Sequence, residues 1–228
     1  MSRRKCFEAE YIAYAGKGNL LIVGLLLLGS CVISYLLSKI IWQLAIMIAA
    51  IVSFGILNFM DYFAFAGSNS KNSLGINLIK SSPYGAELFR KALLQDMINK
   101  LLFSVITICA VTVFVLCRPL GREFSAFFVI LYAAAAFATE QLLLNSSLWI
   151  TRKKGITMQA HFLIMYLTFF AGSLLFLPLV FISEEKSVFV MILYIVIVGA
   201  LAVLANIWLQ KSCNKAYRSM FYDCEVSK

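Results

Sequence analysis

The stretch "VFVMILYIVIVGALAVLANIWLQ", residues 188–210, contains no charged side chain. A helix needs roughly 20 mostly apolar residues to cross the hydrocarbon layer of a bilayer, and this stretch is long enough to do so. The whole chain has the same character, with 62% hydrophobic residues, 14% charged residues and a mean hydropathy of +0.89. A soluble domain carries far more charge. The sequence therefore predicts an integral, multi-pass protein of the cell membrane.

Five further stretches are long and apolar enough to span the bilayer, so the sequence predicts an all-α polytopic fold with six transmembrane helices in a single membrane domain, residues 1–228. Residues 1–19, with aromatic side chains among charged ones, are expected to form a cytoplasmic or interfacial N-terminal segment. Residues 211–228 are expected to form a cytoplasmic tail. The six predicted spans are 20–37, 40–65, 97–117, 125–144, 161–182 and 188–210.

The distribution of Lys and Arg predicts the orientation, because cytoplasmic loops retain these residues. With both termini inside, 16 of the 20 basic residues fall on the cytoplasmic side. The net charge of +9 is then explained by topology and by contact with anionic membrane lipid, and no nucleic-acid partner is expected. The four basic residues expected outside are Lys39, Arg118, Arg122 and Lys186.

The six cysteines show no CxxC spacing. Three are expected in spans and three in the cytoplasm, where thiols stay reduced. The sequence predicts neither a disulfide framework nor a metal site, and no cofactor bound by this chain.

The largest cytoplasmic connection, residues 66–96, contains an amphipathic segment. Ser82 can cap a helix whose first residue is Pro83, a position where the missing N–H costs nothing. Glu87 and Lys91 are four residues apart and can pair on one helix face. The sequence predicts a charged helix that starts at Ser82, lies along the membrane surface and then turns into the third span.

This region, "IKSSPYGAELFRKALLQDMINKLLF" at 79–103, resembles the stretch between spans two and three of ABC-2 type permeases, the membrane subunits of one class of ATP-driven exporter. The short basic connection "TRKKGIT" at 151–157, the basic N-terminal segment and the six-span plan are also similar to that family. The resemblance is carried between spans two and three by Ser81, Ser82, Pro83, Glu87, Arg90 and Lys91.

The resemblance implies that residues 1–228 form a permease domain whose short cytoplasmic helix, Ser82–Lys91, couples it to a separate ATP-binding cassette subunit. ATP and Mg would be bound by that partner, because "GSNSKNS" at 67–73 lacks the GxxxxGK[ST] spacing of a phosphate-binding loop. A second permease, identical or related, would complete the pathway. A simple interfacial helix that anchors span three is the alternative. The residues expected to contact the ATPase are Ser82, Pro83, Tyr84, Glu87, Arg90 and Lys91.

Polar residues inside spans often mark transport paths, and Asp61, Thr139, Glu140 and Gln141 are the candidates here for a transport path or gating. Asp61 is expected near the inner interface, where its carboxylate stays in contact with water. Glu140 lies deeper and must snorkel, pair with another helix or face a cavity.

Two further features of the spans concern packing. Ala134 and Ala138, like Ala135 and Thr139, are four residues apart, a spacing of small residues that lets helices approach closely. His161 begins span five and is expected to be an interface residue.

The cargo expected from the short outer loops and the 14% aromatic content is a hydrophobic or amphipathic molecule, such as a peptide, a lipid-like compound or a drug. The alternative is a substrate-binding membrane subunit of a vitamin or small-molecule importer, which would not need the charged helix. A membrane-embedded enzyme is less well supported, because the spans contain no HExxH or GxSxG motif.

Overall fold

A computed structural model describes five continuous segments of the chain and five isolated positions. The isolated positions, Gly24, Leu25, Leu28, Gly29 and Val32, fall within the first predicted span, which otherwise lies outside the described residues. The continuous segments are 42–61, 85–117, 125–151, 158–181 and 188–222.

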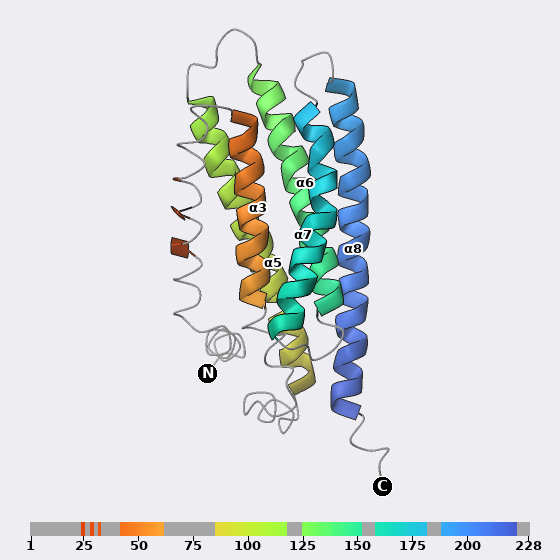
Figure 1. Cartoon of the computed structure of the whole chain (residues 1–228). Helices are drawn as coiled ribbons and strands as arrows, with labels where there is room; N and C mark the ends of the chain where they lie inside the picture. Colours follow the sequence, from red (N-terminus) through yellow and green to blue (C-terminus); the bar gives the residue numbers. More distant parts are fainter. Residues whose placement is uncertain are drawn as a thin grey trace.

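The continuous segments form an all-helical bundle whose successive helices run in opposite directions (Figure 1). Five of its helices are long and apolar enough to cross a membrane, and they overlap the last five predicted spans. The first span and the position of the N-terminus lie outside the described residues. The helices are α3 (Trp42–Asp61), α5 (Gly85–Leu116), α6 (Ala126–Thr151), α7 (Met158–Phe181) and α8 (Val188–Tyr222).

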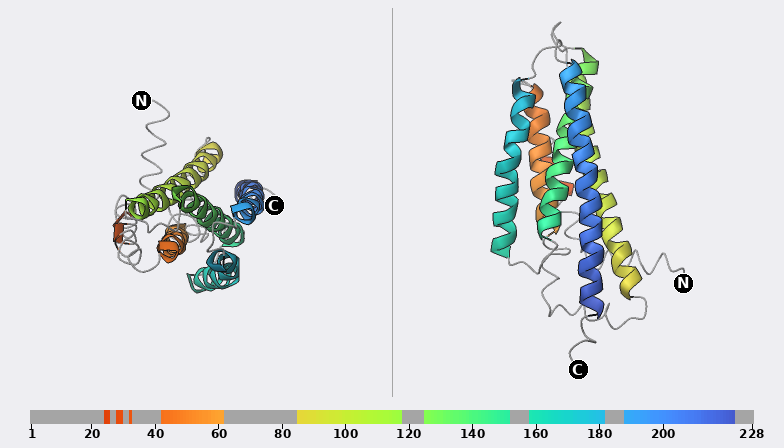
Figure 2. Two further views of the ribbon diagram at one scale, coloured as in Figure 1. Left: turned by 90° about the horizontal axis from the view of Figure 1, so that it is seen from above. Right: turned by 90° about the vertical axis from the view of Figure 1, so that its right-hand side faces the viewer.

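Helix α6 lies at the centre of the bundle (Figure 2). It contacts all four of the other helices, and its contact with α8 is the most extensive. Ala135 and Thr139 are buried, and the Thr139 hydroxyl lies 2.8 Å from the Tyr194 hydroxyl of α8. The small residues of span four therefore do meet a neighbouring helix, because they leave room for its larger side chains.

The structure extends α6 well beyond the predicted end of span four at residue 144. The prediction stopped at the polar run that begins with Asn145, but the helix continues to Thr151. Ser147 Oγ donates a hydrogen bond to Asn58 Oδ1 of α3 at 3.0 Å, and Asn145 faces the Ala202 carbonyl of α8 at 3.5 Å. These polar side chains are tolerated because neighbouring helices satisfy them inside the bundle.

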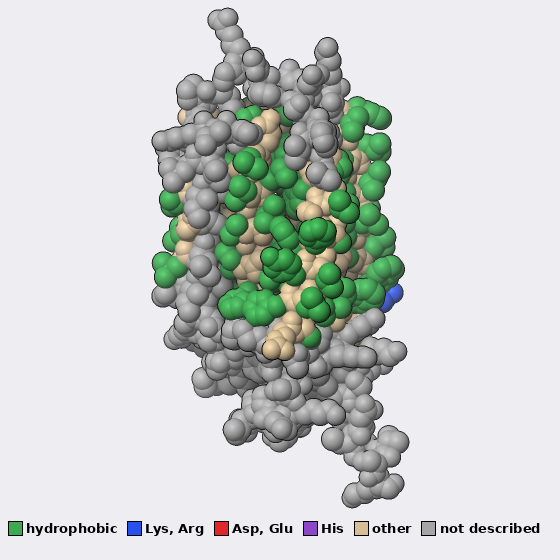
Figure 3. Space-filling view, in the orientation of Figure 1, with side chains coloured by type: hydrophobic (Ala, Val, Ile, Leu, Met, Phe, Trp, Pro, Cys, Tyr) green, Lys and Arg blue, Asp and Glu red, His purple; other side chains and the backbone are tan. Residues whose placement is uncertain are grey.

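The outward faces of the bundle are apolar. Hydrophobic side chains cover the visible face of the described helices (Figure 3). On α7 and α8, large side chains such as Phe170 and Phe189 are more than 70% exposed. In water such a surface would be an interaction site or an aggregation risk, whereas in a bilayer it faces lipid. The described helices therefore have the surface of a membrane protein.

The charged segment and the third span form one helix in the part that the structure describes. Helix α5 continues without interruption for 32 residues from Gly85 to Leu116. The expected change from a surface helix to a separate span is therefore not present between these residues. Intrahelical hydrogen bonding and good helix formers on both sides of residue 94 make continuation cheaper than a break.

Close packing of α7 on α6 at Gly172 leads to a stability prediction. A Cβ atom at Gly172 would lie 2.1 Å from Leu143 Cδ2 and 2.9 Å from Leu143 Cγ. Overfilling a packed site costs about 1–3 kcal/mol, so Gly172→Val should lower the unfolding temperature in detergent. Gly199→Val is the matched control, because a Cβ there meets nothing within 4 Å. Leu143→Ala should partly restore the stability of Gly172→Val; equal stability of the two glycine variants would contradict this packing.

Candidate functional site

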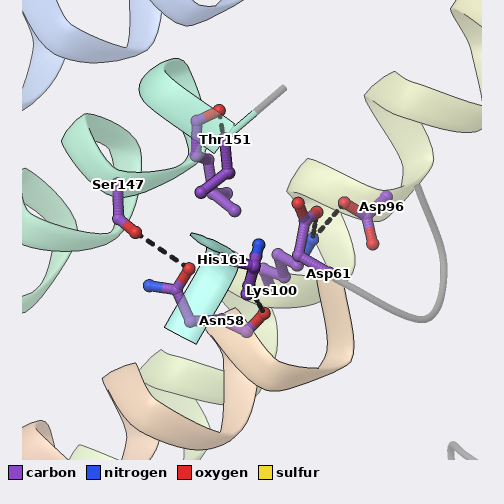
Figure 4. A network of polar contacts seen from close by, with 8 residues as sticks. Asn58, Asp61, Asp96, Lys100, Ser147, Thr151 and His161 are labelled. Carbon is purple, nitrogen blue, oxygen red and sulfur yellow. Dashed lines mark hydrogen bonds and ion pairs between the residues drawn. The ribbon is translucent and has the colours of Figure 1, made fainter. Parts of the chain in front are cut away.

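Three charged side chains meet inside the bundle where the last residue of α3 lies beside the middle of α5 (Figure 4). Lys100 Nζ of α5 lies 2.5 Å from Asp61 Oδ1 of α3. It also pairs with Asp96, four residues earlier on its own helix. The three residues are at most 2% exposed. Lys100 thus connects α5 to α3 in surroundings where a charge without a partner would be costly.

Burial of this charged cluster corrects two expectations. Asp61 does not stay in contact with water; it is fully buried and held by Lys100. Lys100 was counted among the cytoplasmic basic residues that indicate orientation, yet its side chain points into the bundle. The spacing of Asp96 and Lys100 is the sequence signal for a pair on one helix face, but nothing local indicates that Asp61 joins them.

A second group of polar contacts joins α3, α6 and α7 beside the charged cluster. Besides its bond with Ser147, Asn58 offers its backbone carbonyl, which lies 3.1 Å from His161 Nε2 of α7. His161 is fully buried, so its ring packs between the helices and not on the surface of the bundle. The first turn of α7 therefore docks against the end of α3 through His161.

Glu140 is buried near the middle of α6 and faces α5 and α3. Its Oε2 accepts a hydrogen bond from Ser104 Oγ of α5, and Ser104 Oγ accepts one from Gln141 Nε2 at 3.1 Å. The Ser53 hydroxyl of α3 neighbours the same carboxyl. Of the alternatives expected for Glu140, the structure shows pairing with another helix, through the hydrogen bond from Ser104 of α5. Sequence reasoning missed Ser104 and Ser53, because single serines in apolar spans carry no distinctive signal.

The four candidate path residues do not form one site. Glu140 and Gln141 share Ser104, whereas Thr139 faces α8 and Asp61 belongs to the charged cluster. Tyr194, which contacts Thr139, also donates a hydrogen bond to the Leu175 carbonyl of α7 at 2.7 Å. Thr139 therefore serves the packing of α6, α7 and α8.

The polar contacts between α3, α5 and α6 give way to apolar packing toward the first residues of α3 and α6. The Trp42 ring of α3 makes edge contacts with Phe128 and Tyr132 of α6, with centroid distances of 6.2 and 5.3 Å. Val111 and Val115 of α5 are buried at the same end. The described core is thus polar toward the end of α3 at Asp61 and closed by large apolar side chains toward its start at Trp42.

An apolar groove of about 340 Å³ lies between α5 and α6. Its walls are aliphatic and aromatic apart from Cys109 and Thr112. The groove opens on the side of the bundle, where a bilayer would supply acyl chains. Its lining residues are Val105, Ile108, Cys109, Thr112, Val113, Ile130, Ala133, Ala134 and Phe137.

The residues expected to contact an ATPase are only partly described. Ser82, Pro83 and Tyr84 lie outside the described residues. Glu87 and Arg90 are in the first turns of α5, with their side chains not described, and Lys91 is exposed. The described residues contain no group of three or more His, Cys, Asp or Glu side chains that could hold a metal ion.

No family model, curated protein or solved structure matches this chain. The resemblance to ABC-2 type permeases therefore rests on the sequence features given above, and the function has to be argued from the chain's own geometry.

Proposed function

We propose that this chain is the membrane subunit of an ABC-2 type exporter, which moves a hydrophobic or amphipathic cargo with ATP hydrolysed by a separate subunit. The observation that supports this most directly is the continuity of α5. One helix carries both the exposed Lys91 and the buried Lys100 that pairs with Asp61. Force applied to its cytoplasmic end would therefore reach the interior of the bundle.

Two buried contacts would pass this movement on. The Lys100–Asp61 pair would move α3 with α5, and the Ser104–Glu140 hydrogen bond would move α6 with α5. Both contacts lie inside the bundle and are shielded from water. Charge-assisted hydrogen bonds are stronger in such surroundings than at a surface. A second permease would form the other wall of the pathway, and rigid-body movement of the two would alternate its opening.

Charge reversal at the start of α5 tests the coupling. In Arg90→Glu/Lys91→Glu, binding of the ATPase subunit encoded beside this gene should fall by at least about tenfold, the effect of losing about 1.4 kcal/mol, because complementary charges are replaced by repelling ones. Co-purification and ATP turnover measure the effect.

The matched control for this reversal is Lys211→Glu, an exposed lysine at the inner end of α8. It should leave assembly and turnover near the wild-type level. Unchanged assembly of the double variant would remove the coupling role and leave the alternative of an interfacial helix that anchors span three.

The groove between α5 and α6 supports an apolar cargo. Ala134→Trp should fill the groove and reduce cargo-stimulated ATP turnover several-fold, because the indole would occupy the space that an apolar cargo needs. Val196→Trp, at a 61% exposed position of α8, is the control for adding an indole to the lipid-facing surface. Equal cargo stimulation in both variants would exclude the groove as the cargo-binding site. Tight cargo binding by this chain without any ATPase would favour the alternative function, a substrate-binding subunit of an importer.

A further inference from the structure

Glu140 is incompletely satisfied in the middle of the membrane domain. Its residue is fully buried, and its Oε1 makes no hydrogen bond within the described part of the chain. The Ser53 hydroxyl, also fully buried, has no hydrogen-bond partner there either. Buried polar atoms are nearly always satisfied in proteins, and the Ser53 hydroxyl lies beside this carboxyl, so one hydrogen shared between Ser53 Oγ and Glu140 Oε1 would satisfy both atoms.

Depth makes this incomplete satisfaction expensive. At a rise of 1.5 Å per residue, Glu140 lies roughly 16 Å from Thr151, the inner end of α6. No Lys, Arg or His side chain pairs with Glu140 among the described residues; the groups beside its carboxyl are the hydroxyls of Ser104 and Ser53. Ionisable side chains at such positions are rare and belong to ion or proton pathways.

We propose that Glu140 is a proton-binding site that exchanges with the inner aqueous phase through the buried polar groups between α3, α5 and α6. Uptake converts the carboxylate and a hydronium ion into a carboxylic acid and water. Bound at Oε1, the proton would be donated to Ser53 Oγ, which satisfies both vacant atoms at once. Ser104 can remain on Oε2, since a hydroxyl both donates and accepts.

A proton fits this site better than a metal ion. Hard divalent cations take about six or more oxygen ligands. The polar side chains that converge here are one carboxyl, two serine hydroxyls and one amide, and the amide nitrogen of Gln141 is directed at Ser104. A single proton requires only one donor oxygen and one acceptor.

The route to the inner phase follows one face of α5. Ser104 and Lys100 are one helical turn apart, about 6 Å along the axis, a separation that one bridging water molecule can cover. Lys100 contacts Asp61 and Asp96 near the inner end of the bundle. Toward the outside, Trp42, Phe128 and Tyr132 close the core, so exchange is expected from the inner side.

Other ionisable groups in this core must be separated from Glu140 in any titration. Between Glu140 and Thr151, the last residue of α6, the helix has no other ionisable side chain. The groups on the elements packed around Glu140 are Asp61 on α3, Asp96 and Lys100 on α5, Tyr132 on α6, His161 on α7 and Tyr194 on α8.

Infrared difference spectroscopy on the full chain in lipid nanodiscs tests the proposal. Between pH 5 and pH 9 the wild type should show a titrating C=O stretching band of a protonated carboxyl, and Glu140→Gln should lack it. Asp61→Asn should retain it, and so should Thr139→Val, whose hydroxyl faces α8. The proposal is overturned if the band is absent from the wild type or persists in Glu140→Gln.

A second pair of variants keeps the test decisive if Glu140→Gln does not fold. Ser53→Ala and Ser104→Ala retain the carboxyl but each remove one neighbouring hydroxyl. A hydrogen bond to a charged group contributes about 1.5 kcal/mol, so the midpoint of the Glu140 band should shift by about one pH unit. An unchanged midpoint in both variants would also overturn the proposal. These spectra need no ATPase, so their outcome is independent of the coupling proposed above.

Discussion

Lys100→Met is expected to destabilise the protein more than any other substitution considered for this chain. Methionine keeps the length of the side chain but removes the cation that Asp61 and Asp96 share. Breaking a buried ion pair by removing one partner costs about 3–5 kcal/mol, because charge is left behind in a medium that solvates it poorly. Denaturant or thermal unfolding of the chain in detergent measures the loss.

Neutralising the two carboxylates should rescue Lys100→Met. Replacing an entire buried ion pair by neutral groups is often nearly neutral in stability, so Asp61→Asn/Asp96→Asn/Lys100→Met should recover most of the loss. Lys211→Met is the matched control, because that lysine is exposed and its loss should cost no more than about 0.5 kcal/mol. A Lys100→Met protein as stable as Lys211→Met would contradict the cluster.

Ile98→Pro is expected to abolish transport while the ATPase subunit still binds. Ile98 lies on α5 between the charged turns and Lys100, and its side chain is 42% exposed toward lipid. Proline removes the hydrogen bond to the carbonyl of Leu94 and clashes with it, which costs about 3 kcal/mol and bends the helix. A movement at Lys91 would then no longer reach the Lys100–Asp61 pair. Cargo transport in proteoliposomes and co-purification with the ATPase measure the two functions separately.

Ile98→Ala is the control for this helix break. It shortens the same side chain, leaves the helical hydrogen bond in place and should retain transport. Since the proline variant should also be less stable, both variants are compared at a temperature where each remains folded by circular dichroism. Normal transport by folded Ile98→Pro would show that α5 does not act as a rigid connection.

Hydrophobic patterning predicted the membrane architecture well. Uncharged stretches such as 188–210 leave a chain few alternatives to crossing the bilayer, because every backbone polar group must be satisfied within the helix. The ends of the spans were less predictable. The run after Leu144 reads as polar and therefore as a loop, yet α6 includes it because Asn58 and Ala202 of other helices supply partners.

The acidic members Asp61 and Glu140 were predictable from the sequence, but most of their partners were not. Glu140 stands out because a carboxyl roughly 20 Å from the outer end of its predicted span needs a partner, a cavity or a path to the interface. Only the continuation of α6 to Thr151 places it in the middle of the helix. Ser104 and Ser53 do not stand out, since a serine in a span can bond to its own backbone. Lys100 was misassigned for a related reason: a lysine near a span end normally extends to the interface, and only a carboxylate on another helix draws it inward.

The amino-acid sequence by itself determined that this chain has helices long and apolar enough to cross a membrane, where α3, α6, α7 and α8 begin to within three residues, and that the fourth predicted span carries an acid. Each of these properties depends on short-range hydropathy. The tertiary structure alone decided that Asp61 meets Lys100 and that Ser104 meets Glu140, across 39 and 36 positions of chain. Such pairings depend on how helices rotate and tilt against one another, and side-chain packing across the whole bundle sets that rotation.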